Sequence, residues 1–283
     1  MAVDSGSHMP EFASLRSYEL FEDSVKTKAR FVHDDVIRQF LDTVVETIEP
    51  RLRMMPKGRR LFRAQLGCAS VGSAGPDVID ECEVALPLER MVPKAEHVGD
   101  GRVNPRRIPC LYLASTASAA ISEMRPWIGS RITLALFQTV RECRLVDCAR
   151  DTKRNLWLEP ADPDGASEPD AATREKGVWG DIGFAFSKPV THDEPHLDYV
   201  PTQILAETFR HHGYDGIVYK TLLDEKGENV ALFDPEAAKA ISRCLYYLRA
   251  ASLKSAKLET VEACDSFWQD SISSEIQQIE LEG

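Results

Sequence analysis

The chain has 283 residues, enough for one elaborated domain or a core domain with extensions, and it can bury a sizeable core without disulfide or metal support. Its 34 basic and 45 acidic residues give a formal net charge of −11, which argues against direct nucleic-acid binding. No apolar run approaches the roughly 20 residues that a membrane-spanning helix needs, so no membrane contact is expected.

The seven cysteines are scattered and include no C-x-x-C pair. This spacing disfavours a disulfide framework and a zinc site, so we expect reduced cysteines in the cytoplasm, no metal and no prosthetic group. The chain does not open with a basic stretch and an apolar run, so no signal peptide is predicted. Residues 1–12 contain Gly6-Ser7-His8-Met9, which is typical of an expression-tag remnant, and we set them aside from the fold.

The first predicted element is a helix over residues 31–48, where apolar residues recur at helical spacing and Asp34 suits the first turn. Residues 13–59 are therefore expected to form an N-terminal helical extension. A short strand is predicted over 61–66. Residues 67–109 carry many Gly and Pro with few periodic runs, and no regular structure is predicted there.

The central part of the chain has the clearest local signals. A strand is predicted at 111–114, followed by a short helix with Ser115 or Thr116 as its N-cap. Side chains alternate over 132–140 in the manner of a buried strand, and the strand predicted at 143–148 is expected to lie beside it.

After an acidic, Pro-rich segment at 159–170, which predicts a surface loop, the regular pattern resumes. A helix is predicted over 199–212, and Gly213 ends it. The next two strands, at 216–220 and 230–233, are expected to pair across a turn.

From Pro235 onward apolar residues return at helical spacing, so residues 236–283 are predicted to be a C-terminal helical extension. Strands are therefore concentrated in a core at 60–235 between two helical ends, which predicts an α+β fold. The sequence contains no G-x-G-x-x-G and no Walker loop, so it gives no support for a Rossmann dehydrogenase or a P-loop nucleotidase.

Several separated segments of this core place a polar residue at the edge of a strand or helix. In chain order they are Leu61-Phe62-Arg63-Ala64, Gly101-Arg102-Val103-Asn104-Pro105, Leu111-Tyr112-Leu113-Ala114 with Glu123 after it, Gly216-Ile217-Val218-Tyr219-Lys220-Thr221 and Asn229-Val230-Ala231-Leu232-Phe233, with Arg125-Pro126 and Pro201-Thr202-Gln203 in support. Together, from about residue 60 to 234, they resemble the RES domain, a family named for its Arg, Glu and Ser residues. The family serine falls on Thr221, which keeps the hydroxyl and adds a methyl group.

The resemblance implies an ADP-ribosyltransferase-like core of mixed or antiparallel β-sheets with flanking helices at both ends. It also implies NAD degradation, with NAD as the substrate, by hydrolysis (an NAD glycohydrolase) or phosphorolysis. Many members are toxins held by an antitoxin with a helix-turn-helix DNA-binding part, so a toxin of a toxin–antitoxin system and an antitoxin partner are expected. Some members modify proteins with ADP-ribose.

Catalytic roles are expected for Arg63, Tyr112 and Glu123. The planar guanidinium of Arg63 can form two hydrogen bonds to the pyrophosphate of NAD, and Tyr112 can clamp the nicotinamide ring. Glu123 can stabilise the positive charge that develops on the ribose and can orient or deprotonate a nucleophile. Each of these residues could instead have a structural role, in a surface ion pair or in the packing of a strand.

Further NAD contacts are expected from Arg102, Thr221 and Tyr219, alongside Arg63 and Tyr112. Arg102 offers a second fork for the pyrophosphate, and Thr221 can hydrogen-bond ribose or carboxamide. Tyr219 shares a strand face with Thr221, so it is expected either to line the pocket or to pack in the core.

Two other functions remain open on sequence. A mono-ADP-ribosyltransferase would use the same residues with a protein or nucleic-acid acceptor, but such enzymes often carry a second acidic residue near the catalytic glutamate, and the chain has Ile121 there. A non-enzymatic interaction module would leave the pocket vestigial, which the intact Arg63, Tyr112 and Glu123 disfavour.

Overall fold

A computed structural model describes residues 11–75, 78–150, 169–188, 195–224 and 226–250. Contacts divide the chain into Met1–Arg249 and Ala250–Gly283, and every element below belongs to the first unit. None of the helices in the described ranges combines the length and apolar composition that crossing a bilayer requires.

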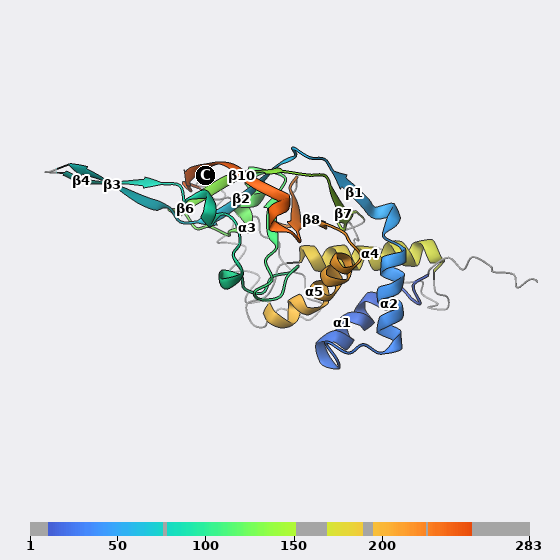
Figure 1. The fold of residues 1–283 in the computed structure, drawn as a ribbon. Helices are drawn as coiled ribbons and strands as arrows, with labels where there is room; N and C mark the ends of the chain where they lie inside the picture. Colours follow the sequence, from blue (N-terminus) through green and yellow to red (C-terminus); the bar gives the residue numbers. More distant parts are fainter. Residues whose placement is uncertain (1–10, 76–77, 151–168, 189–194, 225, 251–283) are drawn as a thin grey trace, which may run out of the picture. The chain divides into compact units, whose positions relative to one another are not determined.

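Most strands join one eight-stranded sheet in the order β1-β7-β8-β9-β5-β2-β6-β10 (Figure 1). Every neighbouring pair is antiparallel except β7 and β8, so the fold is mixed α+β with a mostly antiparallel sheet. The strands of this sheet are β1 Leu52–Met55, β2 Arg60–Leu66, β5 Leu111–Ala114, β6 Arg131–Thr139, β7 Cys143–Asp147, β8 Gly216–Lys220, β9 Glu228–Leu232 and β10 Ala238–Tyr247.

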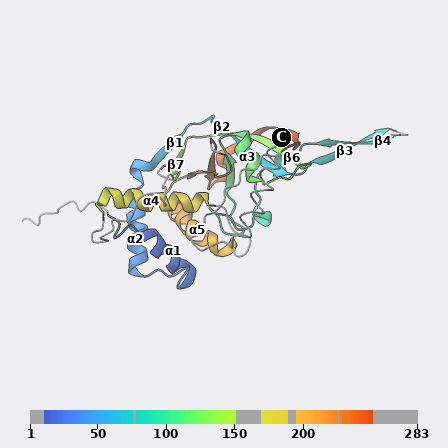
Figure 2. The same cartoon turned by 180° about the vertical axis from the view of Figure 1, so that it is seen from behind.

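Four of the helices gather on one side of the sheet. Helices α4 and α5 lie against it, and α1 and α2 lie outside them, as both views show (Figures 1 and 2). The helices are α1 Ser17–Thr27, α2 Asp35–Glu46, α3 Ala117–Glu123, α4 Ala171–Ser187 and α5 Pro195–His211, with 3₁₀ turns η1 Glu49–Arg51, η2 Leu88–Arg90, η3 Ala95–His97 and η4 Pro235–Ala237.

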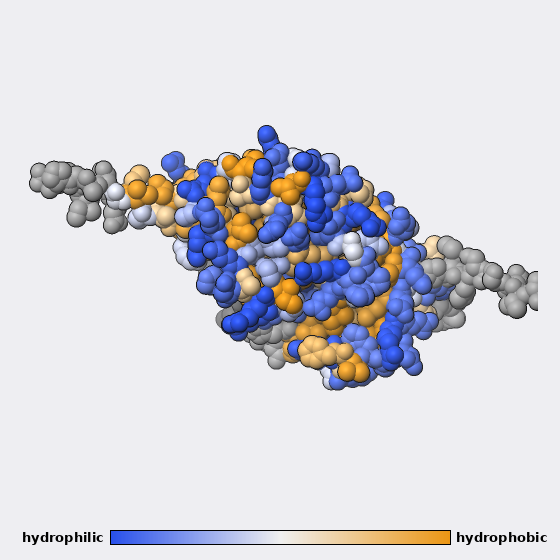
Figure 3. Space-filling model, viewed as in Figure 1, coloured by the Kyte–Doolittle hydropathy of each residue, from blue (hydrophilic) through white to orange (hydrophobic). Residues whose placement is uncertain are grey.

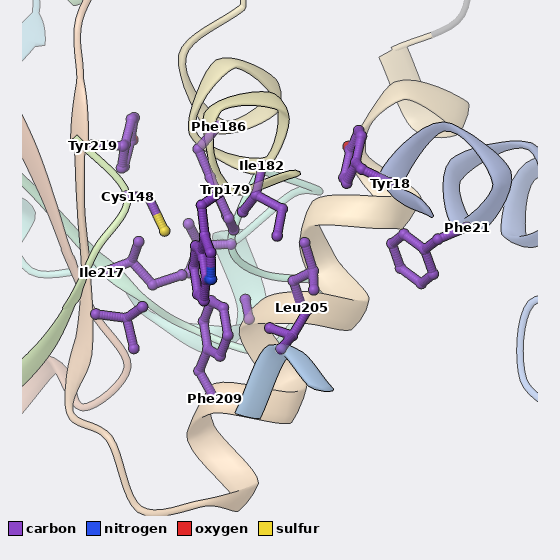
Figure 4. Close-up of a cluster of buried hydrophobic side chains, with 14 of the residues drawn as sticks. Tyr18, Phe21, Cys148, Trp179, Ile182, Phe186, Leu205, Phe209, Ile217 and Tyr219 are labelled. Carbon is purple, nitrogen blue, oxygen red and sulfur yellow. The ribbon is translucent and has the colours of Figure 1, made fainter. Parts of the chain in front are cut away.

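The largest buried side chain, Trp179 of α4, sits at the centre of the helix–sheet core (Figure 4). It packs between Ile217 of the sheet and Phe209 of α5, whose ring is stacked on it at 6.4 Å between centroids. Its indole N–H donates to Thr47 Oγ1 over 3.0 Å, so the polar atom of this buried ring is satisfied. This core ties the N-terminal helices to the sheet.

The local predictions with a strong periodic or capping signal are confirmed. Strands β2, β5, β6, β8 and β9 lie where the sequence places them, and β8 pairs with β9. Thr116, not Ser115, is the N-cap of α3, accepting a hydrogen bond from Ala119 N over 3.0 Å. Gly213, two residues after the end of α5, has a φ of +80°, a conformation that favours glycine.

The predicted helix at 31–48 begins later than its apolar pattern suggests. Asp34 caps α2 by accepting a hydrogen bond from Ile37 N over 2.9 Å, which fixes the first turn at Asp35. Phe31 and Val32 precede the helix and are 90% and 80% exposed. Hydrophobic residues accordingly gather on the surface near the α1–α2 end in Figure 3.

The N-terminal part contains more structure than predicted. Phe12, set aside with residues 1–12, is buried against Phe40 at 5.8 Å between ring centroids. Helix α1 was not predicted, although its buried Tyr18, Phe21 and Val25 follow helical spacing. The packed chain therefore starts before residue 13.

The prediction of no regular structure over 67–109 is wrong, because β3 (Ala69–Gly75) and β4 (Val78–Val84) form an antiparallel hairpin that extends from the end of β2 and β6 (Figure 1). The small residues of β3 give it no clear apolar alternation, and in β4 the alternation is confined to its last four residues. Thr133 of β6 fixes the base, since its hydroxyl donates to Gly67 O and accepts from Leu86 N, both over 2.9 Å.

Strand β7 is not the neighbour of β6, as the sequence suggested, but lies between β1 and β8. Its parallel pairing with β8 places Val146 opposite Ile217. A long connection that contains α4 and α5 separates β7 from β8, which allows this crossover.

The predicted C-terminal helix is wrong for Ala238–Tyr247, which forms β10 along β6. The core therefore continues past residue 235, and β10 belongs to the same sheet as the predicted strands. Most β10 side chains are exposed on both faces, so the strand lacks the alternation that would reveal it. Residues 251–283 of the predicted extension, and residues 159–168 of the predicted loop, lie outside the described residues.

Candidate active site

A cleft of about 290 Å³ opens where β2, β5, β8 and β9 meet α3, α5 and the loop that precedes β5. We call it the Glu123 cleft. Five of the six predicted site residues line it, although they are spread over more than half of the chain, and they are Arg63, Arg102, Tyr112, Glu123 and Tyr219. The sixth, Thr221, contacts Glu123 directly.

The sheet register builds the floor of this cleft. Asn229 of β9 lies opposite Tyr219 of β8 and opposite Ala114 of β5, and Ala114 lies opposite Phe62 of β2. Residues opposite each other in antiparallel strands point to the same face, so the four side chains form one row across the sheet. Each of them lines the cleft.

Glu123 occupies the last turn of α3, above this row. The negative end of the helix dipole gives no support to a carboxylate there. Two donors hold it instead: Thr221 Oγ1 and Asn229 Nδ2 each donate to Glu123 Oε1 over 2.7 Å. Both donors are only 6% exposed. One carboxylate oxygen is thus fixed by the sheet, while Glu123 still lines the cleft.

Arg63 lies where β2 and β5 separate. Phe62 and Ala114 are the one pair of opposite residues that joins these strands. Next to this pair, Arg63 Nη1 donates a hydrogen bond to the Tyr112 carbonyl over 3.1 Å. Arg63 Nε is buried without a hydrogen-bond partner in the described part of the chain. Burial lowers the pKa of Arg63, and no carboxylate of the described residues pairs with it. An uncompensated cation therefore lines the cleft.

Tyr112 uses its hydroxyl within the protein. It donates to Asn104 Oδ1 over 2.7 Å and accepts from Val103 N over 3.0 Å, and burial raises its pKa well above the usual value. The hydroxyl proton is therefore already used within the protein, and the clamp of Tyr112 on nicotinamide stays a prediction. What Tyr112 presents to the cleft is its ring, and its hydroxyl shapes the loop that carries Arg102.

The loop at 101–104 is fixed from a second side by Gln203 of α5. Gln203 Nε2 donates to the carbonyls of Gly101 and Asn104 over 2.9 and 3.0 Å. Gly101 leaves no room for a side chain, because a Cβ there would lie 2.6 Å from the Tyr112 hydroxyl. The loop is therefore rigidly seated against the cleft.

Arg102 hydrogen-bonds the C-terminal end of α4. Its guanidinium donates to the Ala185 carbonyl over 3.0 Å and to the Lys188 carbonyl, and it lies 5.9 Å from the centre of the Tyr199 ring. A cation is favourable at a helix C-terminus, where carbonyls lack partners. Arg102 thus fastens α4 to the cleft, and its binding of pyrophosphate stays a prediction.

Tyr219 is 5% exposed in the floor of the cleft, where it packs on Phe186 at 6.1 Å between ring centroids, and its contact with NAD stays a prediction. Burial, and then the nearby Glu123 carboxylate, raise its pKa above the usual value, so its hydroxyl stays protonated at neutral pH.

Sequence reasoning gave no role to Asn229, Gln203 or Tyr199, although it quoted the first two inside motifs. A signal for Asn229 was present, because asparagine is depleted in strands and a buried amide requires partners. Nothing in the local sequence identifies Glu123 as that partner, since the two residues are 106 positions apart.

The chain matches the family model described as RES domain over residues 89–252, more than half of its length. It belongs to the RES-domain family. The match includes Arg102, Tyr112, Glu123 and Thr221 and extends through β10, whereas Arg63 precedes it and owes its place in the site to geometry.

Among solved structures, this RES-domain chain is similar to one in the crystal structure of the M. tuberculosis MbcT–MbcA toxin–antitoxin complex, with 12% identity and a TM-score of 0.35. The similarity covers 72% of this chain and 92% of that chain. No curated protein matches the sequence.

Proposed function

We propose that this RES-domain protein is an enzyme that degrades NAD by cleaving the nicotinamide–ribose bond, with water or phosphate as the acceptor. The observation that carries the proposal is the meeting of Arg63 and Glu123 in one cleft. Arg63 is a half-buried cation with no acidic partner among the described residues, and Glu123 is a carboxylate fixed at one oxygen. The family assignment and the resemblance described above support the same substrate.

Arg63 supplies the reason for an anionic substrate. A guanidinium that is removed from water without an acidic partner is costly, and a bound diphosphate would offset that cost through charge-assisted hydrogen bonds. The planar fork suits two phosphate oxygens better than an ammonium group does. NAD carries such a diphosphate between its two nucleosides.

Glu123 supplies the chemistry. As the C1′–N bond breaks, its electron pair leaves with nicotinamide, and positive charge develops on the ribose. A carboxylate facing that charge stabilises it without reorganising, because Asn229 and Thr221 already hold one of its oxygens. Water then adds at C1′ and loses a proton, which gives ADP-ribose; phosphate in its place gives ADP-ribose 1″-phosphate.

Hydrolysis or phosphorolysis fits the surroundings of Glu123 better than ADP-ribosyl transfer does. Ile121, where a transferase often has a second acidic residue, packs into the hydrophobic cluster under α3 with Ala64 and Leu134. The side chain of a protein acceptor would therefore be activated by Glu123 alone, without a second carboxylate at position 121. We also propose that the activity serves as a growth-inhibiting toxin controlled by an antitoxin protein with a helix-turn-helix part.

The test incubates the purified protein with NAD alone, with and without inorganic phosphate, and measures nicotinamide release by chromatography. We expect release without any protein acceptor, and none above background with Glu123→Gln. Dependence on phosphate distinguishes phosphorolysis from hydrolysis. Release that requires an added protein or nucleic acid would favour transfer, and no release under any of these conditions would overturn the proposal.

A further inference from the structure

A second cleft, of about 430 Å³, adjoins the Glu123 cleft, and we call it the Lys94 cleft. The two clefts share Arg63, Gly101 and Tyr112 as lining residues. The rest of its wall comes largely from the segment that contains η2 and η3, which supplies no residue to the Glu123 cleft. The unpaired guanidinium of Arg63 therefore stands at the junction of two cavities.

The Lys94 cleft has the chemistry of a nucleotide site. Arg90, Lys94 and His97 are exposed along it, and Arg90 and Lys94 form no ion pair within the described residues. Two carboxylates, Glu89 and Asp100, also line it. Cations can bind a phosphate, carboxylates can accept from ribose hydroxyls, and the imidazole can stack on a base.

The size of the Glu123 cleft is consistent with such an extension. Its volume of about 290 Å³ is just below the ~300–1,000 Å³ typical of small-molecule sites. A dinucleotide consists of two nucleotides, of which only the nicotinamide half has to reach Glu123. The adenosine half needs a second cavity on the other side of the diphosphate.

We propose that the Lys94 cleft binds the adenosine-phosphate half of the dinucleotide, with Arg63 at the diphosphate between the two halves. This inference rests on the proposed function of the Glu123 cleft and adds a specificity to it. The enzyme takes dinucleotides in preference to mononucleotides, because Arg90 and Lys94 contribute binding only when the adenosine half is present.

The test compares NAD with nicotinamide mononucleotide, which keeps the scissile bond and one phosphate but lacks the adenosine half. The variant is Arg90→Ala combined with Lys94→Ala. Its matched control is Lys57→Ala combined with Arg59→Ala, which removes the same charge from exposed positions outside both clefts. The thermal midpoint of each variant verifies that it folds.

We expect the Arg90/Lys94 variant to lower kcat/KM for NAD roughly 10–100-fold and to leave that for the mononucleotide within about twofold. The control variant should change neither. An equal effect on both substrates, or none on NAD, overturns the assignment of this cleft.

Titrating ADP by calorimetry separates this inference from the proposed function, because binding needs no turnover. If the wild type binds ADP and the Arg90/Lys94 variant binds it at least about 10-fold more weakly, the Lys94 cleft is supported even if NAD is not cleaved. Equal affinity of the two proteins for ADP overturns it even if NAD is cleaved.

Discussion

Asn229 Nδ2 donates to Glu123 Oε1 over 2.7 Å, and this bond joins the middle of the sheet to the last turn of α3. The amide of Asn229 is buried, and its strand pairs with β5 on one side and β8 on the other. Its position is therefore set by backbone hydrogen bonds on both edges. Glu123, on a seven-residue helix, takes its orientation from this rigid neighbour.

Replacing Asn229 with leucine should lower kcat for NAD roughly 10–100-fold with little change in KM, because the carboxylate loses its orientation while the Arg63 site remains. Thr221→Val should have an effect of the same kind, and Thr221→Ser, which keeps the hydroxyl, should retain most of the activity. Steady-state kinetics on the three variants measure this. A rise in KM with unchanged kcat would assign Asn229 to substrate binding instead.

Glu123→Gln should preserve the fold and lower NAD turnover by at least ~10²-fold. The glutamine carbonyl can still accept from Thr221 and Asn229, so the local hydrogen bonds survive while the negative charge is lost. Thermal unfolding and nicotinamide release are the two measurements. Equal turnover by a folded variant would move the chemistry away from Glu123.

Arg63→Met should separate stability from function. Removing a half-buried charge that has no acidic partner should stabilise the fold by up to about 1 kcal/mol after the loss of its hydrogen bond to the Tyr112 carbonyl, and NAD binding should be lost. Denaturant unfolding gives the first quantity, and titration of NAD on a Glu123→Gln background gives the second. Arg63→Lys should restore little binding, because an ammonium lacks the planar fork. A variant that is less stable and still binds NAD would make Arg63 structural.

Arg102→Ala should behave in the opposite way to Arg63→Met. It removes the hydrogen bonds to the Ala185 and Lys188 carbonyls, so the free energy of unfolding should fall by about 1–3 kcal/mol. Arg106→Ala, at an exposed position in the same loop, is the control and should leave the stability unchanged. If Arg102→Ala weakens NAD binding without loss of stability, the bonds to α4 contribute little and the pyrophosphate role is favoured.

The Glu228 carboxylate should give the fold a measurable pH dependence. Burial alone would raise its pKa, but hydrogen bonds and charge from Arg53, with Lys220, outweigh burial and lower it below the ordinary 4.5. A lowered pKa stabilises the folded state above the ordinary value, and this contribution is lost as the pH falls through the folded-state pKa. Glu228→Gln should therefore cost about 1 kcal/mol at pH 7 and progressively less below pH 4.5. Urea unfolding at several pH values checks this, and a pH-independent difference would exclude the ion pair as its source.

The sequence was informative wherever a short segment carries its own signal. The alternation in β6, the Thr116 cap of α3 and the glycine after α5 act over a few residues, and those elements form where they were predicted. It also supplied the residue types of the site in the right order. Five of the six candidates line one cleft, although they come from β2, β5, β8, α3 and the loop before β5.

Local signals failed where distant partners decide the structure. Ile241, Leu245 and Leu248 follow helical spacing, yet pairing with β6 makes Ala238–Tyr247 a strand, β10, in which most side chains are exposed. Helix α4 contains Gly177, a poor helix former, which lets Leu15 approach: a Cβ there would lie 2.5 Å from Leu15 Cδ2. Neither partner can be identified from the segment itself.

The sequence by itself determined which groups are available for chemistry, and the tertiary structure decided which of them meet. Arg63 and Arg102 are the same residue type in similar motifs, but one lies in the gap between β2 and β5 without an acid, and the other caps α4. That difference depends on strand order and helix placement, which arise from contacts between residues far apart in the chain. A side chain's type sets what it can bind, and only its packed neighbours determine whether that capacity is already used.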